Sequence, residues 1–577
     1  MEQPTRHSFR TVIVLALLGA VAVVSNATKA VHIDDTAYLE IARAIRADPR
    51  RAMSAGLSWT KAREPIHAVN QPHLFFYFLA ATMDLAGDSD VAFHLVESCF
   101  TVAALLFFHA LARRFAPRDA LLLTSLFVLG PAVLPGQNVM CDLPMLAFWL
   151  AFLWALLTPR RGFHLAYPLL AATAAAAACL IKYTSLILLP VLAFDLWWRG
   201  EWRRLWVLLI PTAVLGLWSL CNYLDYGGIH LLGRESNAKH PEALFGRLVV
   251  FFICLGAVTP FSVVLLPRLV RGRLGLALSA LGLTAGLITL CWSWSVKQEV
   301  PAWWGALRSL FLANGVVVLG WALVAAGVRL LVAAGFSLRP PQAEARGYGQ
   351  FPSAAHRNED ARPFAVLAIL LLGTVAFNVL FAPFVAVRHV LPAVAVTLLL
   401  IGASMARAET EPTEIRIGKL GRGVAFVATV GLGILLAVSD WLLADAYRTV
   451  APQLAAKLSR SDRTIWYVGH WGWQWYAERA GMRQYEPGES PLREGDYLLV
   501  PEMVPRQEIA EKDYQRRQKE GSVFLPSGPG TFLRTMTRDP QGGYYAIKLR
   551  ALPWGPSTAP LDEIVLFRIG PQLDGNP

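Results

Sequence analysis

The sequence predicts a polytopic α-helical membrane protein that ends in a small soluble α/β domain. Of the 577 residues, 55% are hydrophobic and only 16% are charged, with a mean hydropathy of +0.43. A membrane span needs roughly 20 mostly apolar residues, and such a run must be helical because lipid offers the backbone no hydrogen-bonding partners. Beyond Leu443, short strand-like runs replace the long apolar ones, which predicts the soluble domain.

About thirteen apolar segments suit membrane spans. The first, 11–24, follows three basic residues, and we interpret it as an uncleaved anchor because no small-x-small cleavage site follows it. The other predicted spans are 92–111, 120–135, 143–157, 165–180, 185–198, 205–223, 248–266, 274–292, 307–336, 364–384, 390–405 and 424–443.

Basic residues fall on every second loop between these spans, and short cytoplasmic loops are the ones that collect them. The pattern predicts a cytoplasmic N-terminus and a C-terminal tail on the outer side of the membrane. The net charge of +12 is then mainly a topology signal, so it indicates membrane lipids and no nucleic acid as partners. The six cysteines show neither a disulfide framework nor metal spacing.

The chain divides into a transmembrane domain, 1–443, with a long outer first loop at 30–92, and an outer domain, 444–577. In the loop, 35–46 has the pattern of an amphipathic helix lying in the interface, and 73–85 is an apolar helix too short to cross. In the tail we expect strands at 464–469, 496–500, 544–549 and 563–568 and a helix at 473–480.

Two adjacent acids, Asp34 and Asp35, follow the first apolar segment. Adjacent carboxylates repel, so one pKa should rise while its neighbour stays ionised, which suits a general base. The alternative is that either acid caps the helix that follows it.

Five motifs carry a family resemblance: VHIDDTAYLEIARAIRADP, NQPHLFFYFLA, MCDLPMLAFWLAFLWAL, LIKYTSLILLP and RHVLPAVAVTLLL, in this order between Val31 and Leu400. Together they resemble the polyprenyl-phosphate-dependent glycosyltransferases of the GT-C superfamily, and within it family 39, which includes protein O-mannosyltransferases and lipid A aminoarabinose transferases. The resemblance implies a GT-C fold and an enzyme that moves a sugar from a polyprenyl phosphate to an acceptor hydroxyl, with inversion.

The resemblance also implies roles for particular residues. Asp34 corresponds to the catalytic base, Asp35 to the acid beside it, and Asp142 to a second acid that either orients the acceptor or shares the proton with Asp34. The predicted ligands of the donor phosphate are Lys182, Arg388 and His389. Simpler explanations exist, because an acid in a first helical turn is stabilised by the helix dipole and long basic side chains snorkel to lipid headgroups.

Other polar residues of the outer face are expected to line the acceptor cleft, namely Glu64, His67, His73 and His240. Their spacing does not predict a metal site. No cofactor is expected because the donor is already lipid-linked, and a divalent metal is allowed but not required. Where aminoarabinose transferases carry an arginine, a lysine and a proline, this chain has Ala37, Gln71 and His73, so the sugar stays open. The acceptor, whether lipid, glycan or protein, stays open too.

Two other classes of function compete with the enzyme. A transporter or flippase of lipid-linked glycans predicts Gly/Pro-broken helices in both halves and charges near the bilayer midplane. The polar residues gather instead on the predicted outer side of the membrane, which disfavours a transporter. A structural or regulatory membrane protein would tolerate neutralisation of the acidic pair.

Overall fold

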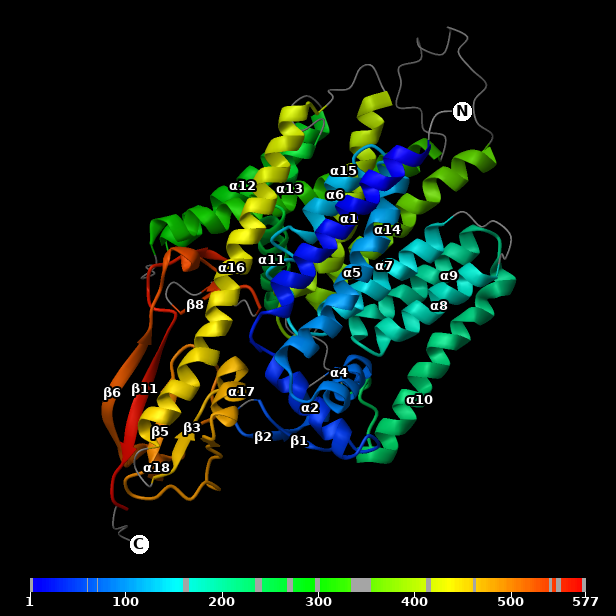
Figure 1. Ribbon diagram of the computed structural model, residues 1–577. Coiled ribbons are helices and arrows are strands. Elements are labelled where there is room, and N and C mark those ends of the chain that lie inside the picture. The colour runs from blue at the N-terminus through cyan, green and yellow to red at the C-terminus, as the bar shows by residue number, and fades with distance from the viewer. Residues whose placement is uncertain are drawn as a thin grey trace.

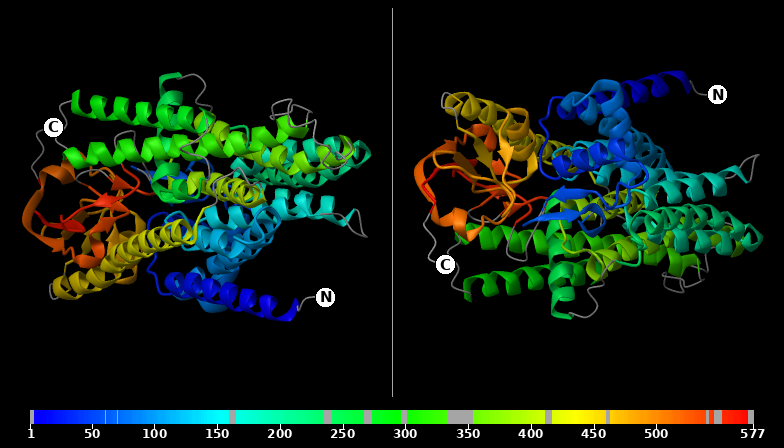
Figure 2. Two further views of the ribbon diagram at one scale, coloured as in Figure 1. Left: turned by 90° about the horizontal axis from the view of Figure 1, so that it is seen from above. Right: turned by 90° about the horizontal axis from the view of Figure 1, so that it is seen from below.

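The computed structural model describes residues 4–572, except Thr60, Asn70 and residues 159–164, 234–240, 267–272, 296–300, 334–353, 411–416, 460–462, 539–541 and 546–551. Most of these residues form a bundle of apolar helices, and a sheet domain lies against one end of it (Figure 1). Figure 2 shows that domain on the side of the molecule away from the start of α1.

Eight helical segments among the described residues are long and apolar enough to cross a membrane, so the protein is a multi-pass membrane protein. The helices that contain them are α1 (Pro4–Ala27), α5 (Asp90–Phe115), α10 (Leu209–Tyr226) with the 3₁₀ turn η2 (Trp202–Leu208), α12 (Arg273–Ser295), α13 (Ala302–Ala333), α14 (Ala354–Leu380), α15 (Val387–Thr410) and α16 (Lys419–Leu458).

Helices also occupy the remaining predicted spans, but these are shorter than a full crossing. They are α6 (Ala120–Val128), α7 (Asp142–Leu157), α8 (Ala166–Cys179), α9 (Leu188–Trp198) after the 3₁₀ turn η1 (Tyr183–Ile187), and α11 (Pro241–Val258) followed by η4 (Ser262–Leu265). Every predicted span therefore contains helix. A total of about thirteen crossings stays a prediction, because length and composition support eight.

The predicted outer loop between α1 and α5 is folded. It holds α2 (Asp35–Ala47), a hairpin of β1 (Gly56–Ser58) and β2 (Arg63–Pro65), α3 (Ile66–Val69) and α4 (Leu74–Ala86). The apolar stripe of α2 is expected to face the membrane interface, but it faces other parts of the protein. This stripe, which includes Ala37, Ile41 and Ile45, is buried against α4 and the C-terminal helix α17 (Trp471–Arg479).

The C-terminal domain is built on a five-stranded sheet in the order β4-β3-β5-β11-β6. The strands β3 and β5 pair in parallel, and β11 lies antiparallel between β5 and β6, with Val565 opposite Val500. The bounds are β3 (Ile465–Tyr467), β4 (Arg483–Gln484), β5 (Tyr497–Pro501), β6 (Arg517–Leu525) and β11 (Asp562–Ile569), with the short helix α18 (Glu511–Gln515) before β6.

Two short ladders and a 3₁₀ turn connect β6 to β11. They are η6 (Pro529–Thr531), β7 (Leu533–Arg534) paired with β10 (Gly555–Pro556), and β8 (Met536–Thr537) paired with β9 (Gly542–Gly543). The predicted strand at 544–549 lies largely outside the described residues. The 40-residue helix α16 runs past Leu443 and joins the bundle to the sheet domain without a break (Figure 1).

Candidate active site

A cavity of about 610 Å³ lies where the α1–α2 connection, α14, α15, η1 and the C-terminal domain meet. Three of the residues that line it are Asp34, Lys182 and Arg388. These side chains come from segments far apart in the chain, as the sequence analysis expected for a single site. The cavity is large enough for a headgroup and a reacting partner, since small-molecule sites are typically about 300–1,000 Å³.

Asp34 and Arg388 form an ion pair in the cavity. An Nη1 hydrogen of Arg388 is donated to Oδ2 of Asp34, and both side chains are mostly buried, at 12% and 17% exposure respectively. The same Nη1 lies 3.6 Å from Sδ of Met140. The Nε–H of Arg388 is buried and has no hydrogen-bond partner among the described residues. A buried N–H without a partner costs free energy, so this group is suited to an incoming anion.

A second ion pair stands beside the first. Lys182, just before η1, places its Nζ 2.6 Å from Oδ1 of Asp142 in the first turn of α7. Within the described part of the chain, Oδ2 of Asp142 is buried without a partner. Lys182 therefore does not snorkel away from the protein. The two acids balance the two bases, so the four side chains carry no net charge when all are ionised.

Two strained residues flank Asp34. Ile33 and Trp471 are the non-glycine residues with positive φ, at 48° and 61°, within the described chain, and both line the cavity. Such conformations are costly for residues with a Cβ and cluster at functional sites. The hydroxyl of Thr36 donates to the carbonyl of Trp471 at 2.6 Å. A Cβ at Gly472 would lie 2.3 Å from the carbonyl oxygen of Val31, so only glycine permits this close packing.

Asp35 does not line the cavity. Its carboxylate is fully buried and accepts a hydrogen bond from the backbone N–H of His32 at 2.8 Å, while Asp34 makes no capping bond to α2. Burial is the largest cause that raises the pKa of Asp35, and the negative charge of Asp34 is a smaller one. The sequence predicts a raised pKa from repulsion between the two neighbouring carboxylates. In the folded protein, burial of Asp35 raises its pKa more than this repulsion does. Asp35 thus supports the turn that presents Asp34.

The walls of the cavity differ in character. One is apolar and aromatic and comes from the end of α14 and the α14–α15 link, with Phe377, Phe381 and Phe384. A second group of lining residues comes from the β1–β2 hairpin and the C-terminal domain, with Trp59 and Trp471. Asp34, Lys182 and Arg388 line the same cavity.

His389 follows Arg388 in the first turn of α15, and its ring already accepts a hydrogen bond. The backbone N–H of Ala386 donates to Nδ1 of His389 at 3.2 Å, and the side-chain amide of Asn378 donates to the His389 carbonyl at 3.2 Å. These contacts fix the first turn of α15 next to Phe384. His389 lines the cavity, so it is near any ligand of Arg388.

The residues predicted for an acceptor cleft are not gathered in this cavity. His67 stacks on Tyr226 with ring centroids 4.2 Å apart, in a separate pocket of about 540 Å³. His73 is buried between Phe76 and Trp218, where burial lowers its pKa to about 3. The remaining two fall elsewhere: Glu64 lies on β2, and His240 lies outside the described residues.

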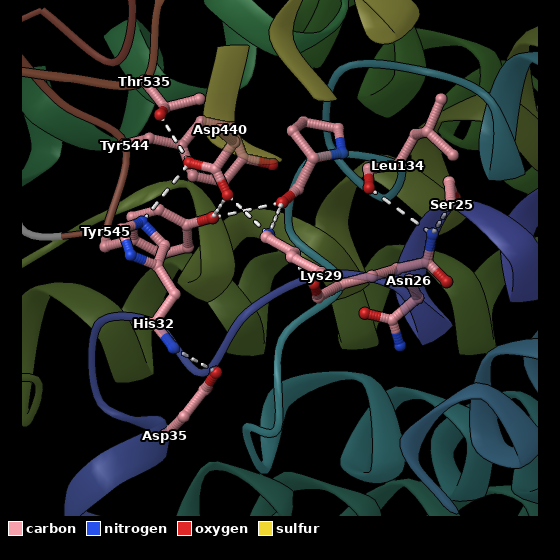
Figure 3. A network of polar contacts seen from close by, with 12 residues as sticks. Ser25, Asn26, Lys29, His32, Asp35, Leu134, Asp440, Thr535, Tyr544 and Tyr545 are labelled. Atoms are coloured by element: carbon pink, nitrogen blue, oxygen red, sulfur yellow. Dashed lines mark hydrogen bonds and ion pairs between the residues drawn. The ribbon is translucent and has the colours of Figure 1, made fainter. Parts of the chain in front are cut away.

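Sequence reasoning missed several cavity residues. Tyr38, Trp471 and Tyr545 line it, and the Tyr38 hydroxyl lies 3.7 Å from Sγ of Cys141. Tyr545 comes from the tail, where nothing in the local sequence marks it. Trp471 belongs to a tryptophan-rich stretch of the tail, for which the sequence allows either stacking on carbohydrate or a place in the domain core. In contrast, Lys29 and Asp440 sit next to or within apolar spans, where a charge is costly, and that signal could have found them. They form an ion pair (Figure 3).

Among the described residues, no three His, Cys, Asp or Glu side chains gather as a metal site. Asp34 and Asp142 are each paired with a base, and Oδ2 of Asp142 is a buried carboxylate oxygen without a partner in the described part of the chain.

Comparison with known proteins gives one family match. Residues 70–222 match the model of the dolichyl-phosphate-mannose-protein mannosyltransferase family. Over this stretch, the chain is similar to the GT-C glycosyltransferases. The matched GT-C-like segment contains Asp142 and Lys182, whereas Asp34 and Arg388 lie outside it. No curated protein sequence matches the chain.

Solved structures show a distant likeness. ArnT from Cupriavidus metallidurans bound to undecaprenyl phosphate is 16% identical, with 85% of this chain and 93% of that chain covered and a TM-score of 0.36. The apo state of the same ArnT gives 16% identity, coverage of 86% and 93%, and a TM-score of 0.39. The archaeal oligosaccharyltransferase AglB from Archaeoglobus fulgidus, in complex with an inhibitory peptide and a dolichol-phosphate, is 14% identical, with coverage of 85% and 70% and a TM-score of 0.42.

Proposed function

We propose that the protein is a membrane glycosyltransferase that transfers a sugar from a polyprenyl-phosphate donor to an acceptor hydroxyl. The observation that carries the proposal is the Asp34–Arg388 ion pair in a cavity with an apolar wall. The pair puts a carboxylate suited to proton abstraction next to a guanidinium suited to phosphate. The match to the mannosyltransferase family supports the same reaction class.

The donor phosphate binds between Arg388 and Lys182. Arg388 offers its unpartnered Nε–H and can exchange Asp34 for a phosphate oxygen, because a guanidinium contacts phosphate through two parallel N–H groups. Lys182 adds a point charge and stays near Asp142. The polyprenyl chain then lies along the apolar wall formed by the phenylalanines of α14 and the α14–α15 link.

Release from Arg388 frees Asp34 to act as the general base. Asp34 takes the proton of the acceptor hydroxyl, and the acceptor oxygen forms a bond to the anomeric carbon of the sugar. The bond between that carbon and the phosphate oxygen breaks, and its electron pair leaves on the phosphate, where Arg388 and Lys182 stabilise the developing charge. A single displacement of this kind inverts the anomeric configuration.

The acceptor enters beside Trp59 and Trp471. Both residues line the cavity, and indole rings provide flat apolar surfaces with a polar edge. The alternation of basic loops supports a cytoplasmic N-terminus. The cavity and the C-terminal domain then face the periplasm of a bacterial inner membrane.

A transfer assay tests the proposal. Purified protein in nanodiscs is given radiolabelled polyprenyl-phosphate sugars and a cell-envelope extract. The wild type should transfer label to the extract, whereas Asp34→Asn should fold equally well and transfer none. Transfer by Asp34→Asn would overturn the role of Asp34 as the base. Absence of transfer by the wild type with all common donors would overturn the proposed activity.

A further inference from the structure

A buried carboxylate on α16 contacts the cavity-lining residue Tyr545 and takes no part in the mechanism above. Asp440 is fully buried inside a candidate membrane span. Its carboxylate faces Nζ of Lys29 at 2.5 Å and accepts hydrogen bonds from the hydroxyls of Thr535 at 2.5 Å and Tyr545 at 2.6 Å. Nε2 of His32 lies 3.7 Å from it. A buried charge with this many partners is costly to isolate, so it fixes their relative positions.

The partners of Asp440 come from two distant parts of the chain, as Figure 3 shows. Lys29 and His32 belong to the α1–α2 connection that carries Asp34, and Lys29 also donates to the carbonyls of Pro135 and Gln137, both at 3.1 Å. Thr535 and Tyr545 belong to the C-terminal domain. Asp440 therefore ties the turn that presents Asp34 to that domain.

The same tyrosine segment reaches the other half of the ion pair. The backbone N–H of Val387, the residue before Arg388, donates to the carbonyl of Tyr544 at 3.1 Å. The Tyr544 hydroxyl donates to the carbonyls of Pro131 and Ala132 at 2.9 and 2.7 Å. The pair Tyr544–Tyr545 thus contacts both the support of Asp34 and the start of α15.

Tyr545 is the member of this network that also lines the cavity. Its ring packs edge-on against His32 with centroids 5.9 Å apart, and its hydroxyl lies 3.1 Å from the carbonyl of Pro135 as well as against Asp440. The Tyr545 side chain therefore links the cavity to Asp440.

We propose that Tyr545 of the C-terminal domain is a positioning residue for the transfer reaction. Through Asp440 and Lys29 it holds the strained Ile33 turn that aims Asp34 at the acceptor. This inference rests on the proposed function. It makes the C-terminal domain a part of the active site, so the bundle alone does not hold a competent base.

The expected signature separates the rate of transfer from the affinity for the donor. Loss of the Tyr545 hydroxyl loosens the support of Asp34 and leaves the cations at Arg388 and Lys182 in place. Misplacement of a reacting group by about 1 Å can cost about 100-fold in rate. Donor binding depends on the cations and should change little.

Tyr545→Phe tests the inference against a matched control, Tyr447→Phe. Tyr447 is also buried, and its hydroxyl donates to Asp562 at 2.9 Å, which joins α16 to β11 without lining the cavity. Tyr545→Phe should lower kcat by about tenfold or more at unchanged undecaprenyl phosphate affinity, and Tyr447→Phe should leave both unchanged. Equal kcat values for the two variants, at equal folded fractions, would overturn the inference.

A charge-removal cycle gives a second test that does not depend on Tyr545. Asp440→Asn leaves the buried Lys29 ammonium without its carboxylate and should lower the transfer rate, whereas Lys29→Met with Asp440→Asn removes both charges and should recover part of it. No recovery, with both variants folded, would contradict the positioning role. If the wild type itself neither binds undecaprenyl phosphate nor transfers sugar, the proposed function fails first, and the two failures are distinguished.

Discussion

Arg388 is ion-paired with Asp34, although 354 residues separate them in the sequence. The pair means that the group suited to bind the donor phosphate is held by the group suited to activate the acceptor. A phosphate that enters the cavity competes with Asp34 for Arg388. Donor binding and release of the base are therefore coupled, and the following predictions test this coupling.

Asp34→Asn should separate binding from chemistry. The substitution removes the carboxylate that competes for Arg388, so the affinity for undecaprenyl phosphate should rise by several-fold while transfer is lost. Native mass spectrometry or fluorescence titration of purified protein in nanodiscs measures the affinity. A weaker affinity in the variant would show that Asp34 supports phosphate binding and does not compete with it.

Arg388→Lys should weaken donor binding although it keeps the charge. Lysine cannot offer the parallel N–H groups of a guanidinium, so we expect the undecaprenyl phosphate affinity to fall by about tenfold. Arg46→Lys is the matched control, because Arg46 pairs with Asp84 on the exposed side of α2, 2.7 Å away. Equal affinities of the two variants would exclude a forked contact between Arg388 and the phosphate.

Trp471→Leu should weaken binding of the acceptor more than binding of the donor. Trp471 lines the cavity beside the proposed acceptor path, so its loss should raise the KM for the acceptor extract by about fivefold or more. The undecaprenyl phosphate affinity should stay near the wild-type value. Trp466→Phe controls for loss of a tryptophan in the same domain, since Trp466 is buried and donates to Asp496 at 3.1 Å. A donor defect alone in Trp471→Leu would place the acceptor elsewhere.

The contact between α2 and the C-terminal domain should weaken as the pH rises. Glu40 on α2 accepts a hydrogen bond from Gln474, and burial raises the pKa of Glu40 from 4.5 to about 8. The folded protein binds this proton more tightly than the unfolded chain. The stability that Glu40 contributes is therefore full below about pH 4.5 and is lost as the pH rises through about 8.

Thermal unfolding from pH 5 to pH 9 checks this prediction. Wild-type stability should fall relative to that of Glu40→Gln across this range, because glutamine stays neutral. Glu489→Gln, which changes an exposed carboxylate, should run parallel to the wild type. Parallel curves for the wild type and Glu40→Gln would show that Glu40 has an ordinary pKa in the folded protein.

Much of the architecture follows from local sequence. The apolar runs predict helices at every span, and the patterns at 464–469, 496–500 and 563–568 predict β3, β5 and β11. These features are visible because hydrophobic periodicity is a property of neighbouring residues. The strand β6 has an exposed, charged pattern and gives no such signal.

The candidate site is harder to predict because its parts meet only in the folded chain. Family motifs single out Asp34, Lys182 and Arg388, and the structure brings all three into one cavity. In contrast, the separate placement of Asp35 and His73 depends on burial, which neighbours in sequence do not set. The contribution of Tyr545 depends on contacts between its tail segment and the helices α16 and α15. More than a hundred residues separate the contacting residues in the sequence, so no local pattern predicts these contacts.

The most direct test of the central claim is an experimental structure with undecaprenyl phosphate bound in nanodiscs. The account predicts density for the phosphate within hydrogen-bonding distance of the Arg388 guanidinium and the Lys182 ammonium, with Asp34 released from Arg388 and the lipid chain along the phenylalanine wall. A phosphate bound outside this cavity, with the Asp34–Arg388 pair intact, would contradict it.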